Sequence, residues 1–235
     1  MSQMDIAHPG KKLSVEERLR KMQRDWDARA RENARYYVNT LKENWTDSEF
    51  FRSGQHEVDQ EILTDMTNIC QGKDPRQMRV LEIGCGAGRV TRALADLFGE
   101  VYAVDVSGEM VKCARLALAD RPNAHIFQNN GMSLTVLGNL EFDFAFSIIV
   151  FQHIPSLAII ENYVREVHRL LKPGCLFKFQ VQGGAPAEPS EYDTWVGAAV
   201  SDEQAVAMAH RCGFEPRHRH GAGDQYFWLW FFKNP

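Results

Sequence analysis

The chain has 235 residues, 44% of them hydrophobic, which is enough to bury one core of ordinary size beside a smaller appendage. A net charge of −4 and an isoelectric point near 6.1 provide no overall positive field, so nucleic acid is a minority hypothesis as a partner. No uncharged run is long enough to span a bilayer, and residues 1–21 lack the apolar core of a signal peptide. We therefore expect a cytoplasmic protein without a membrane partner.

Cysteine and histidine spacing does not predict a metal centre. The five cysteines are scattered and lack paired spacing, which is typical of reduced thiols: Cys70, Cys85, Cys113, Cys175 and Cys212. The segment "RHRH" at 217–220 alternates its side chains between the two faces of a strand. At most two histidines therefore converge there, and no third ligand is evident.

Residues 1–75 are charged, helical in pattern and free of strand-like runs. Ser14 and Glu17 fit a capping box, and apolar residues then recur at the period of one helix face: Val15, Leu19, Met22 and Trp26. A second helical stretch is predicted over about 58–69, before Gly72 and Pro75. We interpret residues 1–75 as a helical cap or lid and residues 76–235 as the core that it covers.

From residue 78 onward, short apolar runs alternate with amphipathic stretches, the pattern of βαβ units with a parallel sheet. The predicted strands cover residues 79–84, 100–107, 124–130, 142–150, 175–182, 214–220 and 226–232. Helices are predicted over 89–98, after Ser107, from 157 to a stop at Pro173, and after a capping box of Ser201 with Gln204. The last strand, "YFWLWFF", is wholly apolar and can be buried only inside a sheet covered on both faces.

The stretch "VLEIGCGAGRV" at 80–90 predicts a strand, a glycine-rich turn and the start of a helix. In an open α/β sheet, ligands bind at such a turn, where the strand order reverses. Gly84 and Gly86 let the backbone approach a ligand, and the helix points free N–H groups at it. The glycines at 84, 86 and 88 do not fit the dinucleotide fingerprint, which needs a glycine where this chain has Arg89. Asp105, ending the second strand, can accept from ribose hydroxyls in either cofactor class.

Five motifs occur in order and at consistent distances: "LEIGCGAGR", "VYAVDVS", "FQNNG", "FDFAFSIIVFQHI" and "RLLKPG". On these motifs, residues 78–180 resemble the class I S-adenosylmethionine-dependent methyltransferases. The resemblance implies an α/β fold with a Rossmann-like, doubly wound, seven-stranded sheet whose last strand is antiparallel and inserted beside the fifth. It also implies S-adenosylmethionine (S-adenosyl-L-methionine) as cofactor and S-adenosylhomocysteine as product.

By position, the resemblance places five residues around the methionine part of the cofactor: Glu82, Gly84, Cys85, Gly86 and Arg89. It places Asp105 at the ribose, and Val106 and Met110 against the adenine. The family usually has an acidic residue after the third strand. Here Asn130 stands in that position, and its amide oxygen can accept the same bond from the adenine amino group. Gly131 offers a backbone N–H to the ring.

Ser147 and Ile148 end the predicted fourth strand and are expected on the sulfonium side of the cofactor. His153 follows at the mouth of the site. A structural bond from His153 to a nearby carbonyl is favoured over catalysis, but if a general base exists, His153 is the first candidate and Tyr37 the second. Because this family commonly places a lid ahead of the first strand, Tyr36 or Tyr37 is expected near the methionine carboxylate.

The predicted reaction moves a methyl group to an oxygen or nitrogen of a small molecule by in-line displacement, while the protein aligns two reactants and excludes water. The segment "SIIVFQ" stands where enzymes that methylate base amino groups have an Asn/Asp-Pro-Pro-aromatic signature. Two alternatives stay open: an NAD(P)-dependent reductase, and a non-catalytic S-adenosylmethionine-binding protein. The sequence predicts neither the identity of the acceptor nor the oligomeric state.

Overall fold

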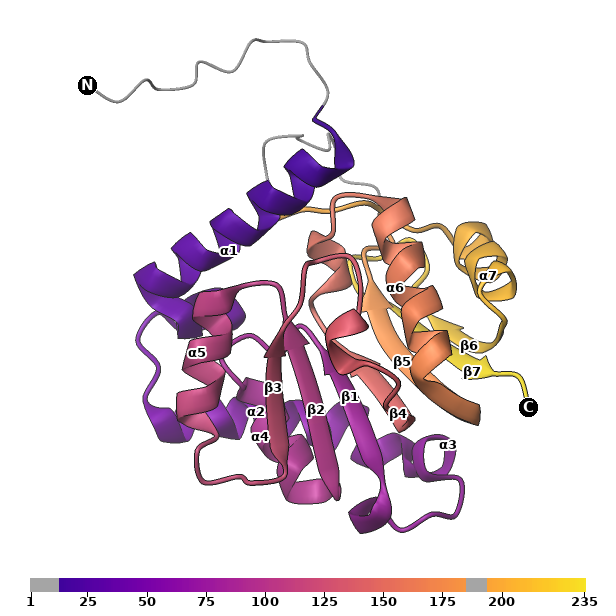
Figure 1. Cartoon of the computed structure of the whole chain (residues 1–235), viewed down its shortest axis with the longest axis horizontal. Helices are drawn as coiled ribbons and strands as arrows, with labels where there is room; N and C mark the ends of the chain where they lie inside the picture. The colour runs from indigo at the N-terminus through magenta and orange to yellow at the C-terminus, as the bar shows by residue number, and fades with distance from the viewer. Residues whose placement is uncertain (1–12, 185–193) are drawn as a thin grey trace.

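A seven-stranded sheet runs through the centre of the molecule in the order β3-β2-β1-β4-β5-β7-β6 (Figure 1). The computed structural model describes residues 13–184 and 194–235. The strands are β1 (Arg79–Ile83), β2 (Glu100–Asp105), β3 (Ala124–Gln128), β4 (Phe142–Ser147), β5 (Leu171–Val181), β6 (Phe214–His220) and β7 (Phe227–Lys233). All neighbouring pairs are parallel except those of β7, which lies antiparallel between β5 and β6. The predicted doubly wound sheet with an inserted last strand is confirmed.

The helices that flank the sheet are α1 (Val15–Val38), α2 (Asp47–Glu61), α3 (Met66–Cys70), α4 (Arg89–Leu97), α5 (Gly108–Ala117), α6 (Leu157–Leu170) and α7 (Asp202–Arg211). Short 3₁₀ turns occur at η1 (Leu63–Asp65), η2 (Pro75–Gln77), η3 (Thr135–Leu137) and η4 (Phe151–His153). The predicted capping boxes at Ser14 and Ser201 and the predicted cap at Ser107 are all formed.

The two faces of the sheet bury separate hydrophobic clusters, because successive residues of a strand point to opposite sides. Leu81 of β1 packs in a cluster that includes α6 and α7, whereas its neighbour Val80 packs in one that includes α2 and α4. Figure 1 shows α6 in front of the sheet and α2 and α4 behind it. This two-sided cover explains how a strand as apolar as β7 is accommodated, with Phe227, Leu229 and Phe231 fully buried.

On the opposite face of β7, the buried side chain of Lys178 covers two tryptophan rings. Lys178 of β5 lies 4.7 Å and 5.3 Å from the ring centres of Trp230 and Trp228. Its ammonium forms ion pairs with Glu61 and Asp65 at 3.3 Å and 3.5 Å, although its side chain is only 3% exposed. The end of α2 and η1 is therefore tied to the centre of the sheet.

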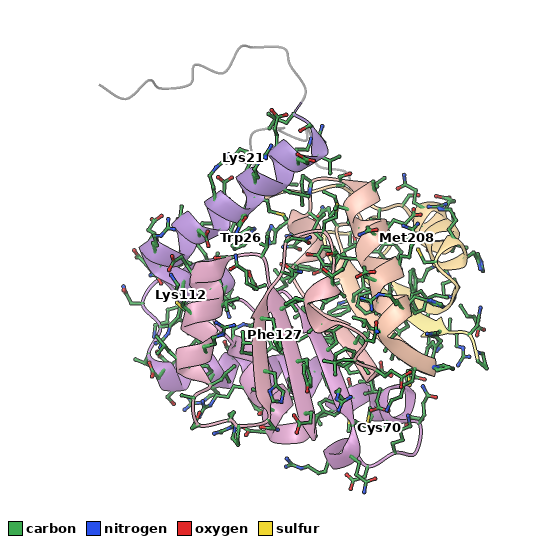
Figure 2. All side chains as sticks on the ribbon, viewed as in Figure 1. Lys21, Trp26, Cys70, Lys112, Phe127 and Met208 are labelled. Carbon is green, nitrogen blue, oxygen red and sulfur yellow. The ribbon has the colours of Figure 1, made fainter. Side chains whose placement is uncertain are left out.

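The segment ahead of β1 differs from the predicted pattern. The second helix begins at Asp47, behind a capping box of Thr46 with Glu49, and not near residue 58. It packs against α4 so closely that a Cβ on Gly54 would lie 1.9 Å from the Arg89 carbonyl oxygen. Among the described helices ahead of β1, α1 crosses the ends of the strands, in contact with α5 (Figure 1). Figure 2 shows Trp26 on the side of α1 that faces the sheet.

Two other boundaries differ from prediction. The fourth strand ends at Ser147, and residues 148–150 leave the sheet as a turn before η4. Ile149 in this turn has φ +55°, a conformation that is strained for a β-branched residue. The sixth helix ends at Leu170 and passes directly into β5, so Pro173 and Gly174 belong to the start of that strand.

Candidate active site

A cavity of about 370 Å³ opens at the carboxyl ends of β1, β2, β3 and β4, beneath α1. The loops after these strands form its floor, and α1 and the segment around Trp195 form its roof. Because the strand order reverses between β1 and β4, the cavity lies at the switch point of the sheet, where α/β proteins bind their ligands.

The turn after β1 needs glycine for two separate reasons. Gly84 and Gly86 have φ values of +78° and +52°, which favour glycine over any other residue. A Cβ on Gly84 would lie 2.1 Å from a methyl of Val150, and one on Gly86 would lie 2.7 Å from a methyl of Val38. The backbone turn is thus enclosed between the β4 loop and the end of α1, and both glycines line the cavity.

Asp105 ends β2 and lines the cavity. One carboxylate oxygen accepts a hydrogen bond of 2.8 Å from the Gly86 N–H, and the other accepts one of 2.9 Å from the Ser107 N–H. Burial raises the pKa of the carboxyl to about 6. Each oxygen retains acceptor capacity beyond its backbone bond, which suits a pair of hydroxyl groups.

Two buried side chains of opposite charge in the cavity wall have unsatisfied atoms. The Oε2 atom of Glu82 and the Nε atom of Arg89 have no hydrogen-bond partner within residues 13–184 and 194–235. Arg89 otherwise donates to the Ser53 carbonyl at 3.1 Å and to Glu57 at 3.3 Å. Burial raises the pKa of Glu82 to about 7. An acceptor and a donor of this kind fit the ammonium and carboxylate of an amino acid, because unpaired buried polar groups are costly.

Cys85 lies between the glycines of this turn and also lines the cavity. It is 3% exposed, and burial raises the pKa of its thiol well above the ordinary value. A thiol in this state is a packing group and not a nucleophile.

On the side of β3, the structure brings Asn129 into the cavity wall and leaves Asn130 outside it. Asn129 donates to the Tyr163 hydroxyl at 2.8 Å and accepts from the Gly131 N–H at 3.2 Å. The Asn130 oxygen instead accepts from the backbone N–H groups of residues 132 and 133, at 3.0 Å and 2.7 Å. Gly131 does not line the cavity, whereas the predicted apolar residues Val106 and Met110 do.

The end of β4 contributes one of its two predicted residues directly. Ile148 lines the cavity. Ser147 lies beneath it, fully buried, and its hydroxyl donates to the Ile83 carbonyl at 2.9 Å. Ser147 therefore joins the ends of β4 and β1 below the floor of the cavity.

His153 of η4 is only 5% exposed and faces the cavity among aromatic rings. Its ring centre lies 5.2 Å from that of Trp26 and 5.1 Å from that of Trp195. Its Nδ1 atom is hydrogen-bonded to the Trp195 carbonyl, and its Nε2 atom lies 3.3 Å from Nε2 of Gln152. The expected bond from His153 to a nearby carbonyl is present at Nδ1. The second ring nitrogen, Nε2, faces Gln152.

The two tyrosines of α1 differ in position. Tyr37 lines the cavity, whereas Tyr36 lies outside the wall with its ring 5.2 Å from that of Tyr37. The Tyr37 hydroxyl donates to Glu32 at 2.9 Å, and this bond raises the pKa of the hydroxyl. Tyr37 is therefore a hydrogen-bond donor at neutral pH and a poor base.

Several wall residues were not predicted: Met22, Trp26, Asn129, Gln152, Trp195, Gln225 and Tyr226. Trp26 was placed on a helix face without a role, and Asn129 is the neighbour of the residue chosen. The sequence around Trp195 shows no pattern that could have placed it. Within residues 13–184 and 194–235, no group of three or more His, Cys, Asp or Glu side chains could hold a metal ion. Nor is any helix in those ranges long and apolar enough to cross a membrane.

Comparison with known proteins identifies a methyltransferase segment. Residues 81–179 match a family model described as a methyltransferase domain. The ubiquinone biosynthesis O-methyltransferase of Xanthomonas oryzae pv. oryzae is 33% identical over 97 residues, which cover 41% of this chain and 39% of that protein. The malonyl-[acyl-carrier protein] O-methyltransferase of Enterobacter lignolyticus is 33% identical over 104 residues, 44% and 39% of the two chains. The chain thus matches about two fifths of the length of these curated relatives.

Solved structures share the fold over most of the chain. Phosphoethanolamine N-methyltransferase of Haemonchus contortus superimposes with a TM-score of 0.69 and 14% identity, covering 95% of this chain and 50% of that one. Magnesium protoporphyrin IX methyltransferase of Synechocystis, solved with bound S-adenosylhomocysteine, gives 0.64 at 15% identity, covering 90% and 98%. At these identities the likeness establishes the architecture.

The sheet order and the glycine turn at its switch point define a Rossmann-like α/β protein with a nucleotide-cofactor site. Residues 81–179 match a methyltransferase domain, and the fold around them is one that solved S-adenosylmethionine-dependent methyltransferases share. Such methyltransferases use S-adenosylmethionine as cofactor, so the matched domain favours S-adenosylmethionine over the NAD(P) of the reductase alternative.

Proposed function

We propose that the protein transfers the methyl group of S-adenosylmethionine to an oxygen or nitrogen of a small molecule, with S-adenosylhomocysteine as product. The observation that carries the proposal is the convergence in one cavity of Asp105, the unpaired atoms of Glu82 and Arg89, and the imidazole of His153. Glu82 and Arg89 suit the charged amino-acid part of the cofactor, Asp105 suits its ribose, and His153 suits the reacting centre.

The cofactor is proposed to lie across the ends of β1, β2 and β3. Glu82 would accept from its ammonium group, and Arg89 with the turn of Gly84, Cys85 and Gly86 would face its carboxylate. Asp105 would bind the ribose hydroxyls. Tyr36 would act indirectly: its ring packs against that of Tyr37, which lines the cavity and is proposed to lie near the methionine carboxylate.

For the adenine we propose a slot between Val106 and Met110. Asn129, which lines the cavity, is proposed to meet the adenine edge in place of Asn130, which does not line it. Asn130 and Gly131 would act on it indirectly, since Gly131 donates to Asn129 and Asn130 orders the following turn. Ile148, supported by Ser147 below, would line the reacting side.

When bound, S-adenosylmethionine supplies an electrophilic methyl group on a positively charged sulfur. The protein aligns the acceptor and excludes water, and a base is needed where the acceptor is poorly ionised. His153 is the proposed base, because the O–H proton of the acceptor can pass to Nε2 as the acceptor oxygen gains its new bond to carbon. Tyr37 is proposed as a donor in the wall, since its raised pKa keeps it protonated.

A small acceptor suits the rest of the wall, which is largely apolar and aromatic. Trp26, Tyr37, Trp195 and Tyr226 line the part of the cavity beneath α1. The curated relatives are O-methyltransferases, which favours oxygen over nitrogen as the atom methylated. The described charged residues of the wall, Glu57, Glu82, Arg89 and Asp105, all belong to the proposed cofactor side.

The proposal is tested in two steps with purified, ligand-stripped protein. Calorimetry should detect binding of both S-adenosylmethionine and S-adenosylhomocysteine, and absence of heat with both would overturn the proposal. Transfer from a labelled methyl donor is then measured against a panel of phenols, carboxylates and amines. His153→Gln should lower turnover at least tenfold while cofactor affinity is retained, whereas a protein that binds the cofactor but methylates no acceptor would support the non-catalytic alternative.

A further inference from the structure

The end of the cavity near β3 contains a buried pair of polar side chains that come from distant parts of the chain. Asn129, just after β3, is 7% exposed, and Tyr163 of α6 is 4% exposed. Both line the cavity, and the Nδ2 atom of Asn129 lies 2.8 Å from the Tyr163 hydroxyl. Polar groups buried this deeply are costly unless they are hydrogen-bonded, so each donor and acceptor of the pair should have a use.

Packing alone does not account for the hydroxyl of Tyr163. The other buried residues of α6 are all aliphatic: Ile159, Ile160, Val164, Val167 and Leu170. The Tyr163 ring lies in the same hydrophobic cluster as these residues, with its centre 5.7 Å from that of Phe151. A phenylalanine would fill this place without bringing a hydroxyl into the interior.

The orientation of the Asn129 amide follows from its contact with Gly131. The Gly131 N–H can only donate, and it donates to the Oδ1 atom of Asn129 at 3.2 Å. The amide nitrogen therefore faces Tyr163 and donates to its hydroxyl. Because the hydroxyl oxygen accepts this bond, its own proton must point in another direction.

The Tyr163 proton has no hydrogen-bond acceptor among the residues that the structure describes, where the bond from Asn129 is the one that the hydroxyl forms. Burial raises the pKa of this hydroxyl, and the nearby charge of Asp105 raises it further, so the proton stays in place at neutral pH. The oxygens of Asp105 accept instead from the backbone N–H groups of Gly86 and Ser107. Tyr163 is therefore a donor in the cavity wall with one hydrogen bond still to give.

We infer that Tyr163 is a further cofactor-binding residue, whose hydroxyl donates to a ring nitrogen beside the amino group of adenine while the oxygen of Asn129 accepts from that amino group. The inference rests on the proposed function, in which the adenine lies at Asn129. The adenine amino group donates, and the ring nitrogens on its two sides, N1 and N7, accept. Asn129 Oδ1 retains one lone pair beside its bond from Gly131, so the pair offers one acceptor and one donor as neighbours.

The same pair would discriminate adenine from an oxo-purine. In hypoxanthine, an oxygen that only accepts replaces the amino group, and N1 carries a proton. The Asn129 oxygen would then face a second acceptor, a mismatch that is costly in a buried site. S-Inosylhomocysteine, which carries this base, should bind at least tenfold more weakly than S-adenosylhomocysteine. Equal affinity for the two would contradict the contact from Asn129.

Calorimetry on purified, ligand-stripped native protein is the first test of Tyr163. S-Adenosylhomocysteine is compared with two analogues in which carbon replaces N1 or N7, so that the base loses one acceptor and keeps its amino group. We expect one of these analogues to bind about 5- to 50-fold more weakly than the parent compound, which identifies the nitrogen involved. Equal affinity for all three compounds would overturn the inference without any variant having to fold.

Tyr163→Phe then assigns the lost bond to the hydroxyl, because it keeps the ring and removes only the O–H group. The variant should bind S-adenosylhomocysteine about 5- to 50-fold more weakly than native protein does. Its affinities for the parent compound and for the affected analogue should lie within twofold of each other, since the bond is already absent. A difference between these two compounds as large in Tyr163→Phe as in native protein would overturn the inference, because the hydroxyl would then act elsewhere.

The matched control is Tyr102→Phe on β2. Tyr102 packs against the same hydrophobic cluster as Tyr163 but does not line the cavity. This variant should bind all three compounds as native protein does, and urea unfolding shows whether each variant is folded under the conditions of the assay. Failure of native protein to bind S-adenosylhomocysteine would contradict the proposed function, whereas binding without preference among the three compounds would overturn only the role of Tyr163.

Discussion

The carboxylate of Asp105 accepts a hydrogen bond of 2.8 Å from the backbone N–H of Gly86. This contact joins the end of β2 to the turn after β1, two parallel neighbours in the sheet. The position of the glycine turn therefore depends on the carboxylate that is proposed to hold the ribose. A change at residue 105 should disturb both the hydroxyl contacts and the approach of the turn to the ligand.

Asp105→Asn tests this dependence. The amide retains one acceptor but replaces the other with a donor, which would face the backbone N–H of either Gly86 or Ser107. Loss of charge-assisted hydrogen bonds of this kind is worth about 1.5–3 kcal/mol, so we expect S-adenosylhomocysteine to bind roughly 10- to 100-fold more weakly by calorimetry. Asp96→Asn, an exposed carboxylate paired with Arg121, is the matched control and should bind as the native protein does. Affinity within twofold of native in Asp105→Asn would contradict the ribose role.

Glu82→Gln addresses the cost of a buried carboxylate whose Oε2 atom has no hydrogen-bond partner among the described residues. Burial raises the pKa of Glu82 to about 7 from an ordinary value of 4.5. Between these two values the folded protein keeps a proton that the unfolded chain has released, so the contribution of this group to stability falls as pH rises through that window. We expect the ligand-free Gln variant to be more stable than native protein at pH 8, by on the order of 3 kcal/mol at most, and equal to it near pH 4.5.

Urea unfolding at several pH values measures this difference, and Glu141→Gln, at an exposed carboxylate, serves as the matched control. The same Gln variant should bind S-adenosylmethionine at least tenfold more weakly, because the neutral amide replaces an anion facing the ammonium group. A variant that is stabilised at pH 8 but binds normally would separate the burial cost from the proposed role.

What the sequence predicted well was local. The turn from Gly84 to Arg89 and the carboxylate at 105 each follow a strand within a few residues, so spacing alone positioned them. The apolar sequence of β7 predicted its burial within the sheet, and the family resemblance implied its insertion beside the fifth strand. Lys178 and Gln180, polar residues in the apolar β5, were a signal in the sequence that went unused.

What the sequence could not predict depends on contacts between distant segments. Asp25 meets Thr194 across 169 positions, and Trp195 thereby reaches His153. The choice between Asn129 and Asn130 depends on where β3 ends, and element ends are set by pairing with β2 as much as by local residues. The start of the second helix was predicted too late because its apolar residues Phe50 and Phe51 are adjacent, and no further apolar side chain follows them until Val58.

Asp27 joins α1 to the N-terminus of α5, and its replacement tests the proposed role of α1 as a lid. Its Oδ1 atom accepts from the Ser107 hydroxyl at 2.6 Å and from the Glu109 N–H at 3.2 Å. Asp27→Ala should increase amide hydrogen exchange across residues 15–38 and weaken S-adenosylhomocysteine binding about 3- to 10-fold, since it removes two bonds without touching the cofactor side. Glu16→Ala, on the same helix and exposed, is the control. Unchanged exchange in Asp27→Ala would show that other contacts hold α1.

Gly84→Ala measures how tightly the turn is enclosed, and the chain offers a matched glycine. Gly84 and Gly174 have φ values of +78° and +77°, so alanine at either position is strained by a similar amount, about 1–2 kcal/mol. At Gly174 a new Cβ meets nothing within 4 Å, whereas at Gly84 it would lie 2.1 Å from a Val150 methyl. Overpacking should therefore destabilise Gly84→Ala by about 1–3 kcal/mol more than Gly174→Ala in urea unfolding.

Adding Val150→Ala should recover part of this extra loss in Gly84→Ala and none in Gly174→Ala, because only the clash at Gly84 involves the Val150 side chain. Equal destabilisation of the two glycine variants would show that Val150 moves aside, and that the turn is less closely confined than the distances imply.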